Sequence, residues 1–64
     1  MWVIEHSASP PCWIAERIHP VSGYDVTFQR KLAKRFTNQE DARHEILRLG
    51  LPGSWTVQQI GWIR

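Results

Sequence analysis

The sequence predicts an α+β domain: a small antiparallel sheet of three to four strands with one helix packed on one face. Residues 37–52 have the pattern of a single helix with stop signals at both ends. β-Branched and aromatic residues are concentrated on both sides of this helix, which is typical of strands. The predicted order is strand, strand, a third short strand, helix and closing strand.

The 64 residues predict one domain, 1–64, with a small core. Chains of this size usually need a metal, disulfides, an oligomeric partner or unusually large core side chains. Cys12 is the only cysteine, so an internal disulfide is excluded and a reducing, intracellular setting is expected. Four tryptophans can each bury on the order of 200 Å² and could supply the missing core. They are Trp2, Trp13, Trp55 and Trp62.

The start of the chain predicts a cytoplasmic protein. Met1 is followed directly by Trp2, Val3 and Ile4, so no basic leader precedes an apolar stretch and no signal peptide is expected. No apolar run approaches the roughly 20 residues that span a bilayer, so no membrane contact is predicted. The formal charge of +2 is too small to indicate nucleic-acid binding by itself.

The first half of the chain predicts two strands and a weaker third. Trp2 to His6 is the first, and it ends where serines and prolines follow. Cys12 to Ile18 is the second, with Ile14 and Ile18 expected on one side of it. After a turn, Tyr24 to Phe28 alternates weakly and could complete a hairpin. Residues 29–36 are interpreted as a turn followed by a short strand.

The helix has predicted signals at both of its ends. Thr37 and Glu40 have the spacing of a capping box, in which each side chain bonds the other residue's amide. Gly50 can adopt the left-handed conformation that ends a helix, and Leu51 can then pack back on Ile46.

The helix over residues 38–49 has one narrow apolar stripe, so it is expected to pack on a single surface, the sheet. At 100° per residue, Ala42, Ile46 and Leu49 share that stripe, whereas Leu47 lies outside it.

Residues 54–64 predict the closing strand, beside the first strand or at the centre of the sheet. Trp55 and Val57 share one parity, and Ile60 and Trp62 share the other. A bulge near Gln58 and Gln59 would bring all four to the same side. Without a bulge, the strand is apolar on different faces in its two halves.

No catalytic, cofactor or metal site is predicted, and the protein is not expected to be an enzyme. Cys12 with His6 or His19 could form a thiolate and base pair, but nothing in the sequence brings them together. These three residues and His44 also lack the paired short spacings of structural zinc sites.

The strongest charge feature is residues 30–35, which hold four cations beside Phe28 and Phe36. A basic cluster next to stackable aromatic rings is typical of nucleic-acid contact. The predicted contact residues are Arg30, Lys31, Lys34 and Arg35. The alternative is a solvated connection that keeps an edge of the sheet soluble.

The tryptophans allow two interpretations. Trp2 and Trp55 are expected to face the helix, where Ala42 leaves room for an indole. Trp13 and Trp62 are expected on the opposite sheet face, where an apolar patch would mark an interface. The predicted interface residues are Trp13, Trp62, Ile63 and Leu47. The alternative is that all four indoles belong to the core.

The ten residues from Ala33 to Ala42, Ala-Lys-Arg-Phe-Thr-Asn-Gln-Glu-Asp-Ala, resemble a pattern in short phage- and prophage-encoded proteins of unknown function. In those proteins an early strand pair precedes this stretch, and a helix and a tryptophan-containing strand follow it. The resemblance implies a compact ββαβ fold without an agreed activity, so it assigns no functional residue. It favours host proteins or nucleic acid as partners.

The leading hypothesis is a non-catalytic protein-interaction module, of phage or prophage type, that pairs with itself or with a host protein. The pairing surface would be an aromatic sheet face or the terminal strand. The alternative is nucleic-acid binding through residues 30–35. Neither a small-molecule substrate nor a cofactor is predicted.

Overall fold

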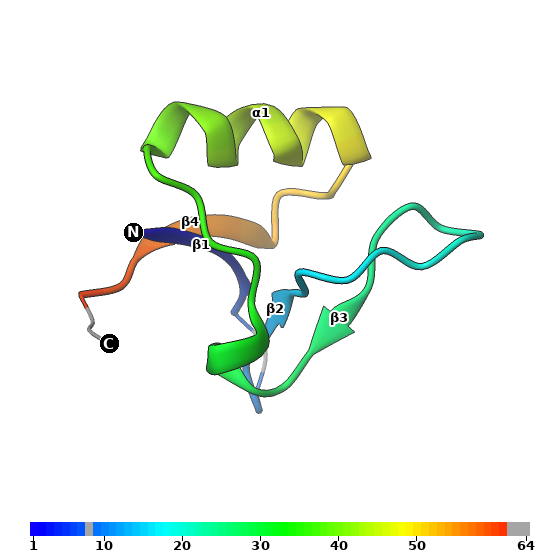
Figure 1. Ribbon diagram of the computed structural model, residues 1–64, viewed down its shortest axis with the longest axis horizontal. Helices are drawn as coiled ribbons and strands as arrows, with labels where there is room; N and C mark the ends of the chain where they lie inside the picture. Colours follow the sequence, from blue (N-terminus) through cyan, green and yellow to red (C-terminus); the bar gives the residue numbers. More distant parts are fainter. Residues whose placement is uncertain (8, 62–64) are drawn as a thin grey trace.

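The computed structural model describes residues 1–7 and 9–61. Its elements are β1 (Trp2–His6), β2 (Cys12–Ile14), β3 (Val26–Thr27), the 3₁₀ helix η1 (Arg30–Leu32), α1 (Gln39–Leu49) and β4 (Trp55–Gln59). The strands form one antiparallel sheet in the order β3-β2-β1-β4, and α1 lies across one face of it (Figure 1). The predicted α+β class is confirmed. Within the described ranges, no helix is long and apolar enough to cross a membrane.

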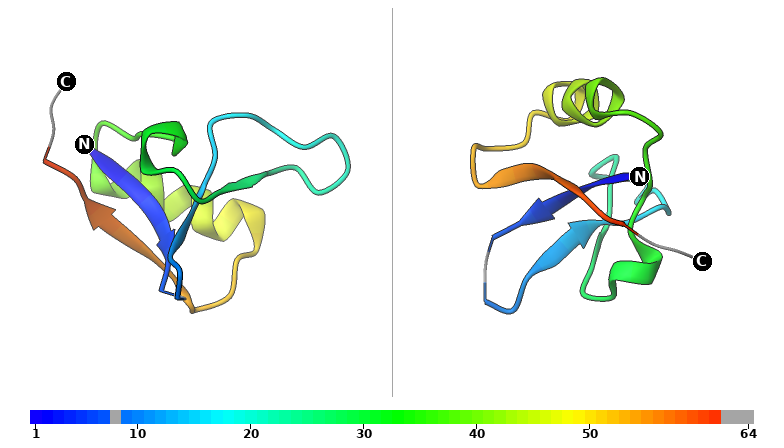
Figure 2. Two further views of the ribbon diagram at one scale, coloured as in Figure 1. Left: turned by 90° about the horizontal axis from the view of Figure 1, so that it is seen from below. Right: turned by 90° about the vertical axis from the view of Figure 1, so that its left-hand side faces the viewer.

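The sheet is covered on both faces, because the segment that holds η1 lies on the side opposite α1 (Figure 2). Val3 and Ile4 are both fully buried, and as neighbours on a strand they point to different layers. The layer under α1 contains Ile4, Ile14, Phe36 and Ala42, with Trp2, Tyr24, Ile46, Leu51, Trp55 and Val57 packed against them. The opposite layer contains Val3, Trp13, Ala33 and Ile60. The sequence predicted that Trp2 and Trp55 lie in the layer under the helix, and it did not predict the cover over the second layer.

β1 has its predicted bounds, but β2 is shorter than predicted. β2 separates from β1 after Ile14, and the backbone of Ile14 and Glu16 then hydrogen-bonds residues 32–34. The Lys34 amide donates to the Ile14 carbonyl at 2.9 Å. Ile18 is consequently outside the sheet, and 70% of its surface is exposed. The expectation that Ile14 and Ile18 share one face of a strand is therefore wrong.

Residues 16–25 form an arm that projects from the sheet between β2 and β3 (Figure 1). Arg17 and Asp25 close its base with an ion pair of 2.6 Å, and this hydrogen bond is the main cause of the lowered pKa of Asp25. At the tip, Nδ1 of His19 accepts from the amide of Val21 at 3.1 Å. β3 holds only Val26 and Thr27 of the predicted strand 24–28.

Residues 33–36 fill the space that opens where β2 leaves β1. Trp2 and Phe36 exchange two backbone hydrogen bonds of 2.9 and 2.8 Å, and Ala33 forms a second bridge to Ala15. The predicted turn is η1, and the predicted short strand is reduced to these two bridges.

α1 begins one residue later than the predicted capping box requires. Asn38 is the N-cap, and its side-chain oxygen accepts from the Asp41 amide at 2.8 Å. Phe36 is held extended against Trp2, so the chain turns into the helix only after Thr37. The predicted capping box of Thr37 and Glu40 is therefore wrong.

The end of α1 is as predicted. Gly50 has φ of +67°, its amide bonds the Leu47 carbonyl at 3.2 Å, and the Leu51 amide bonds the Ile46 carbonyl at 3.1 Å. This is a Schellman motif, in which Leu51 and Ile46 pack in the same layer.

Gly50→Ala is expected to lower the free energy of unfolding by about 1 kcal/mol, because a side chain disfavours the left-handed conformation. Gly53→Ala is the matched control, since both positions have open space for a Cβ and only Gly50 has a positive φ. Urea denaturation of both variants measures the difference. Equal losses would contradict this account of the helix end.

β4 runs beside β1 in an unbroken antiparallel register, from Trp2 opposite Gln59 to His6 opposite Trp55. This register has no bulge near Gln58 and Gln59, so the first of the two alternatives left open by the sequence does not occur. Trp55 and Val57 face α1, whereas Ile60 follows the strand into the opposite layer. The strand is thus apolar on two faces, the alternative that the sequence left open. Trp62 and Ile63 lie outside the described residues.

Candidate protein-interaction surface

β4 forms one edge of the sheet, and its outward backbone groups can be assigned from the ladder with β1. The Ser7 amide bonds the Ser54 carbonyl at 3.5 Å, and the Ile60 amide bonds the Met1 carbonyl at 2.9 Å. Because bonding alternates along an antiparallel pair, even-numbered residues of β4 face β1 and odd-numbered residues face away. Within residues 1–7 and 9–61, the backbone N–H and C=O groups of Val57 and Gln59 have no hydrogen-bond partner.

This edge lacks the usual protection against strand pairing. Native edge strands are commonly blunted by charged side chains, proline, bulges or very short length. β4 has the sequence Trp-Thr-Val-Gln-Gln, without a charge or proline, and pairs with β1 over all five residues. The opposite edge, β3, is only two residues long. β4 is therefore the edge that can accept another strand.

One flank of α1 lies on the same side as this edge. Glu45 and Leu47 project about 200° apart around the helix, on either side of Ile46. Glu45 contacts Lys34 at 3.6 Å, and Lys34 belongs to the segment on the side of β1 away from β4. Leu47, 77% exposed, therefore projects toward the β4 side.

Glu40 and Arg43 share this flank, because they precede Leu47 by seven and four residues. We call the combination of the outward β4 edge and this helix flank the edge surface. It consists of Val57, Gln59, Glu40, Arg43 and Leu47.

The other flank of α1 is fixed by electrostatics. Glu45 accepts hydrogen bonds of 3.0 and 2.5 Å from Arg48 and forms an ion pair with Lys34. The bonds from Arg48 are the main cause of the lowered pKa of Glu45, and the nearby charge of Lys34 also lowers it. The carboxylate thus joins α1 to residues 33–36.

Acidification is expected to remove the contribution of the Glu45 carboxylate to the free energy of unfolding. The pKa of Glu45 is lower in the folded protein than its ordinary value of 4.5, so its stabilisation is complete above that pH and is lost as the pH falls through and below it. Glu45→Gln should therefore lose less stability than the parent between about pH 5 and pH 3. Glu16→Gln, at an exposed glutamate, is the control. Thermal unfolding across pH measures the effect, and parallel profiles for parent and Glu45→Gln would contradict it.

The predicted interface residues lie in different environments. The Trp13 indole is only 8% exposed and packs in the layer with Ala33, with the Arg30 guanidinium 6.0 Å from its ring centre. Trp13 therefore belongs to the core of the single chain, on the predicted sheet face. Leu47 is exposed and lies on the edge surface.

The predicted basic segment is partly engaged inside the molecule. Lys34 pairs with Glu45 and lies 5.5 Å from the Phe36 ring centre. Arg35 donates to the Lys31 carbonyl at 3.1 Å. Arg30 and Lys31 are exposed on η1, close in sequence to Phe28, which is 66% exposed.

The structure brings His6 and Cys12 together as opposite residues of β1 and β2, a pairing the sequence did not predict. Burial is the main cause of the raised pKa of the Cys12 thiol, and the charge of Glu5 adds to it. This shift disfavours the thiolate that nucleophilic chemistry needs. The His6 ring packs edge-on against Trp55 at 4.8 Å.

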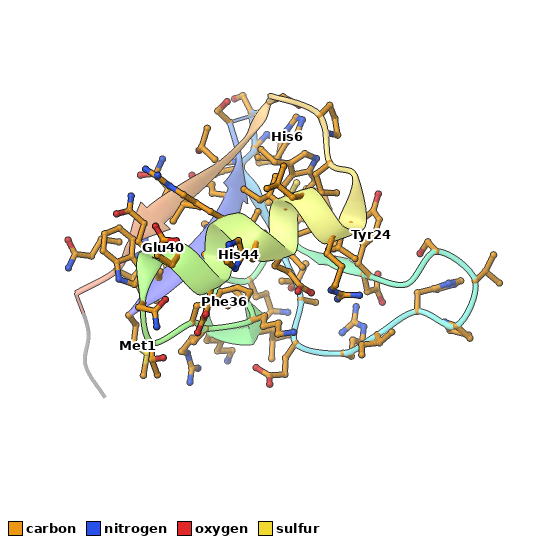
Figure 3. All side chains as sticks on the ribbon, turned by 90° about the horizontal axis from the view of Figure 1, so that it is seen from above. Met1, His6, Tyr24, Phe36, Glu40 and His44 are labelled. Atoms are coloured by element: carbon orange, nitrogen blue, oxygen red, sulfur yellow. The ribbon has the colours of Figure 1, made fainter. Side chains whose placement is uncertain are left out.

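The remaining histidines lie apart from this pair. His19 is on the arm, and His44 is on the face of α1 turned away from the sheet (Figure 3). Across the described part of the chain, no group of three or more His, Cys, Asp or Glu residues could hold a metal ion.

Two apolar residues on the arm, Ile18 and Val21, were not predicted to be exposed, and they are 70% and 88% exposed. The turn sequence around His19 and Pro20 indicates that Ile18 and Val21 lie in a connection between strands. The terminal strand was predicted as a pairing edge, but the outward backbone groups of Val57 and Gln59 were not. The sequence feature that indicates the open edge is the absence of charge from residue 54 to residue 61.

Comparisons of the chain with protein-family models, with curated proteins and with solved structures found no match.

Proposed function

We propose that this protein is a small non-catalytic protein-interaction module that binds an extended segment of a partner by adding it to β4. The observation that carries the proposal is the uncharged edge, on which Val57 and Gln59 present unpaired backbone groups among the described residues. In such binding, main-chain hydrogen bonds supply affinity and alternate side chains supply specificity.

The edge surface has parts suited to both roles. Leu47 offers an exposed apolar contact above the edge, and Thr56 and Gln58 form the polar face below it. The side chains of Thr56 and Gln58 are already hydrogen-bonded to each other at 3.0 Å. An added strand would therefore meet an apolar flank on one side and an ordered polar row on the other.

Titration of the isotope-labelled protein with an eight-residue peptide of alternating threonine and valine tests this function by NMR. The amide signals of Val57 and Gln59 are expected to shift and to become protected from solvent exchange. Gln59→Pro should weaken binding, because it removes an outward donor without touching the ladder to β1. Gln59→Ala, which keeps the donor, is its control. An unperturbed spectrum, or shifts confined to residues far from β4, would refute the proposal.

Nucleic-acid binding is the second candidate, favoured by the exposed Phe28 ring beside exposed Arg30 and Lys31. It predicts that affinity for a single-stranded oligonucleotide falls steeply with salt. Arg30→Gln with Lys31→Gln should flatten this dependence, whereas Arg43→Gln, at an exposed cation on α1, should not. Lys34 is unsuitable for the test, because its loss would also break the contact with Glu45. Binding that is indifferent to the double substitution would exclude this candidate.

A phage or prophage origin, a host-protein partner and a cytoplasmic location remain predictions from the sequence.

A further inference from the structure

We infer that the strand added to β4 is the β4 of a second copy of this chain, so that the protein forms a two-fold dimer with one continuous sheet. This inference rests on the proposed function, because it uses the same edge. It adds the identity of the partner and a role for the exposed flank of α1.

The outward groups of β4 are self-complementary. A two-fold axis through Gln58, perpendicular to the sheet, places Val57 opposite Gln59 of the second copy and pairs all their outward N–H and C=O groups. The Trp55 amide keeps its bond to the Pro52 carbonyl, at 3.1 Å, in this register. Gln58 then meets Gln58 of the second copy on the face away from α1, where two amide side chains can bond each other.

The position of α1 suits the same axis. α1 packs on both β1 and β4, as the end view in Figure 2 shows. Neighbouring strands are about 4.8 Å apart, so the axis lies half a strand spacing outside β4. Because α1 lies over the gap between β1 and β4, the helix is half a spacing inside β4, and therefore about one strand spacing from the axis. The two helices would then be about 10 Å apart, which matches the 8–10 Å separation of packed helices. The Leu47 side chains, exposed in the single chain, would project into the space between them.

Charge also favours a second copy. The edge surface carries one carboxylate, Glu40, and one guanidinium, Arg43, so it has no net charge in a chain whose formal charge is +2. The two-fold makes the helices antiparallel, so that this flank, which has no net charge, meets its own copy without a charge imbalance. The cations of η1 lie on the other side of the sheet and do not oppose this contact.

Sedimentation velocity of the whole chain, from about 10 µM to about 1 mM, tests the dimer. The expected result is a concentration-dependent shift from the monomer mass of 7.5 kDa to twice that mass. Leu47→Lys and Gln59→Pro should each weaken association at least about tenfold. Their controls are His44→Lys, on the outer face of the same helix, and Gln59→Ala. Circular dichroism confirms that each variant is folded.

Three outcomes decide between the possibilities. A dimer that both Leu47→Lys and Gln59→Pro weaken supports the inference. A monomer at every concentration overturns it, as does a dimer that is indifferent to these substitutions. If the chain stays monomeric while the threonine-valine peptide still binds at Val57 and Gln59, strand addition stands and only the self-pairing is wrong.

Discussion

Trp13→Ala is expected to unfold most of the protein at room temperature. The indole is 92% buried between the sheet and the segment that holds η1, and its loss leaves a cavity beside Ala33 and Ile60. Replacing a buried tryptophan by alanine costs about 3–5 kcal/mol. A domain of this size has a total stability of roughly 3–5 kcal/mol, so little remains after the substitution. Loss of the cooperative thermal transition measures the effect.

Trp13→Phe is the control, because it keeps an aromatic ring beneath Arg30 and should leave a cooperative transition at lower temperature. A Trp13→Ala variant with normal stability and impaired association would contradict the burial described here. That result would return Trp13 to the interface predicted from the sequence.

Ile14→Ala is expected to have the second-largest effect, about 2–5 kcal/mol. Ile14 is 1% exposed under α1, where it packs in the layer with Ile4 and Phe36. The matched substitution Ile18→Ala removes the same atoms from a side chain that is 70% exposed, and it should change stability by less than about 0.5 kcal/mol. Urea denaturation of both variants gives the comparison.

Similar losses for the two isoleucines would mean that both lie on a buried strand face. The sequence alone predicted that arrangement, so this pair of variants tests the sequence pattern against the structure directly.

The elements predicted correctly are those with strong local signals. Trp2–His6 is followed by a serine- and proline-rich segment, which marks the end of the strand. Gly50 is the residue type that most readily adopts the left-handed conformation at the end of a helix. Trp2 and Trp55 lie under α1 beside Ala42, as predicted, because residue parity and helical periodicity agree there. Local patterns of this kind do not depend on distant contacts.

The elements predicted wrongly depend on contacts between distant residues. Ile14 and Ile18 fit a strand locally, but competing hydrogen bonds to residues 32–34 draw the chain out of the sheet. The helix starts at Gln39 because Trp2, far away in sequence, holds Phe36 extended. Neither contact can be predicted from the sequence pattern around the affected residue.

The edge surface was predicted only in part. The terminal strand was named as a pairing edge and Leu47 as an interface residue, and both lie on this surface. Trp13 was not recognised as covered, because the cover comes from η1, whose residues look like a solvated charged turn. The alternation of backbone groups that exposes Val57 and Gln59 follows from the register with β1, which a sequence does not specify.

Amide hydrogen exchange along β4 tests the central claim, that this strand presents an open edge able to pair. In dilute protein, the Thr56 and Gln58 amides, which face β1, should exchange slowly, whereas those of Val57 and Gln59 should exchange rapidly. Raising the protein concentration should slow exchange at Val57 and Gln59 and leave Thr56 and Gln58 nearly unchanged. Slow exchange at all four amides in dilute protein would mean that the edge is already covered. Fast exchange at Val57 and Gln59 at every concentration, and also with the threonine-valine peptide present, would mean that nothing pairs with it.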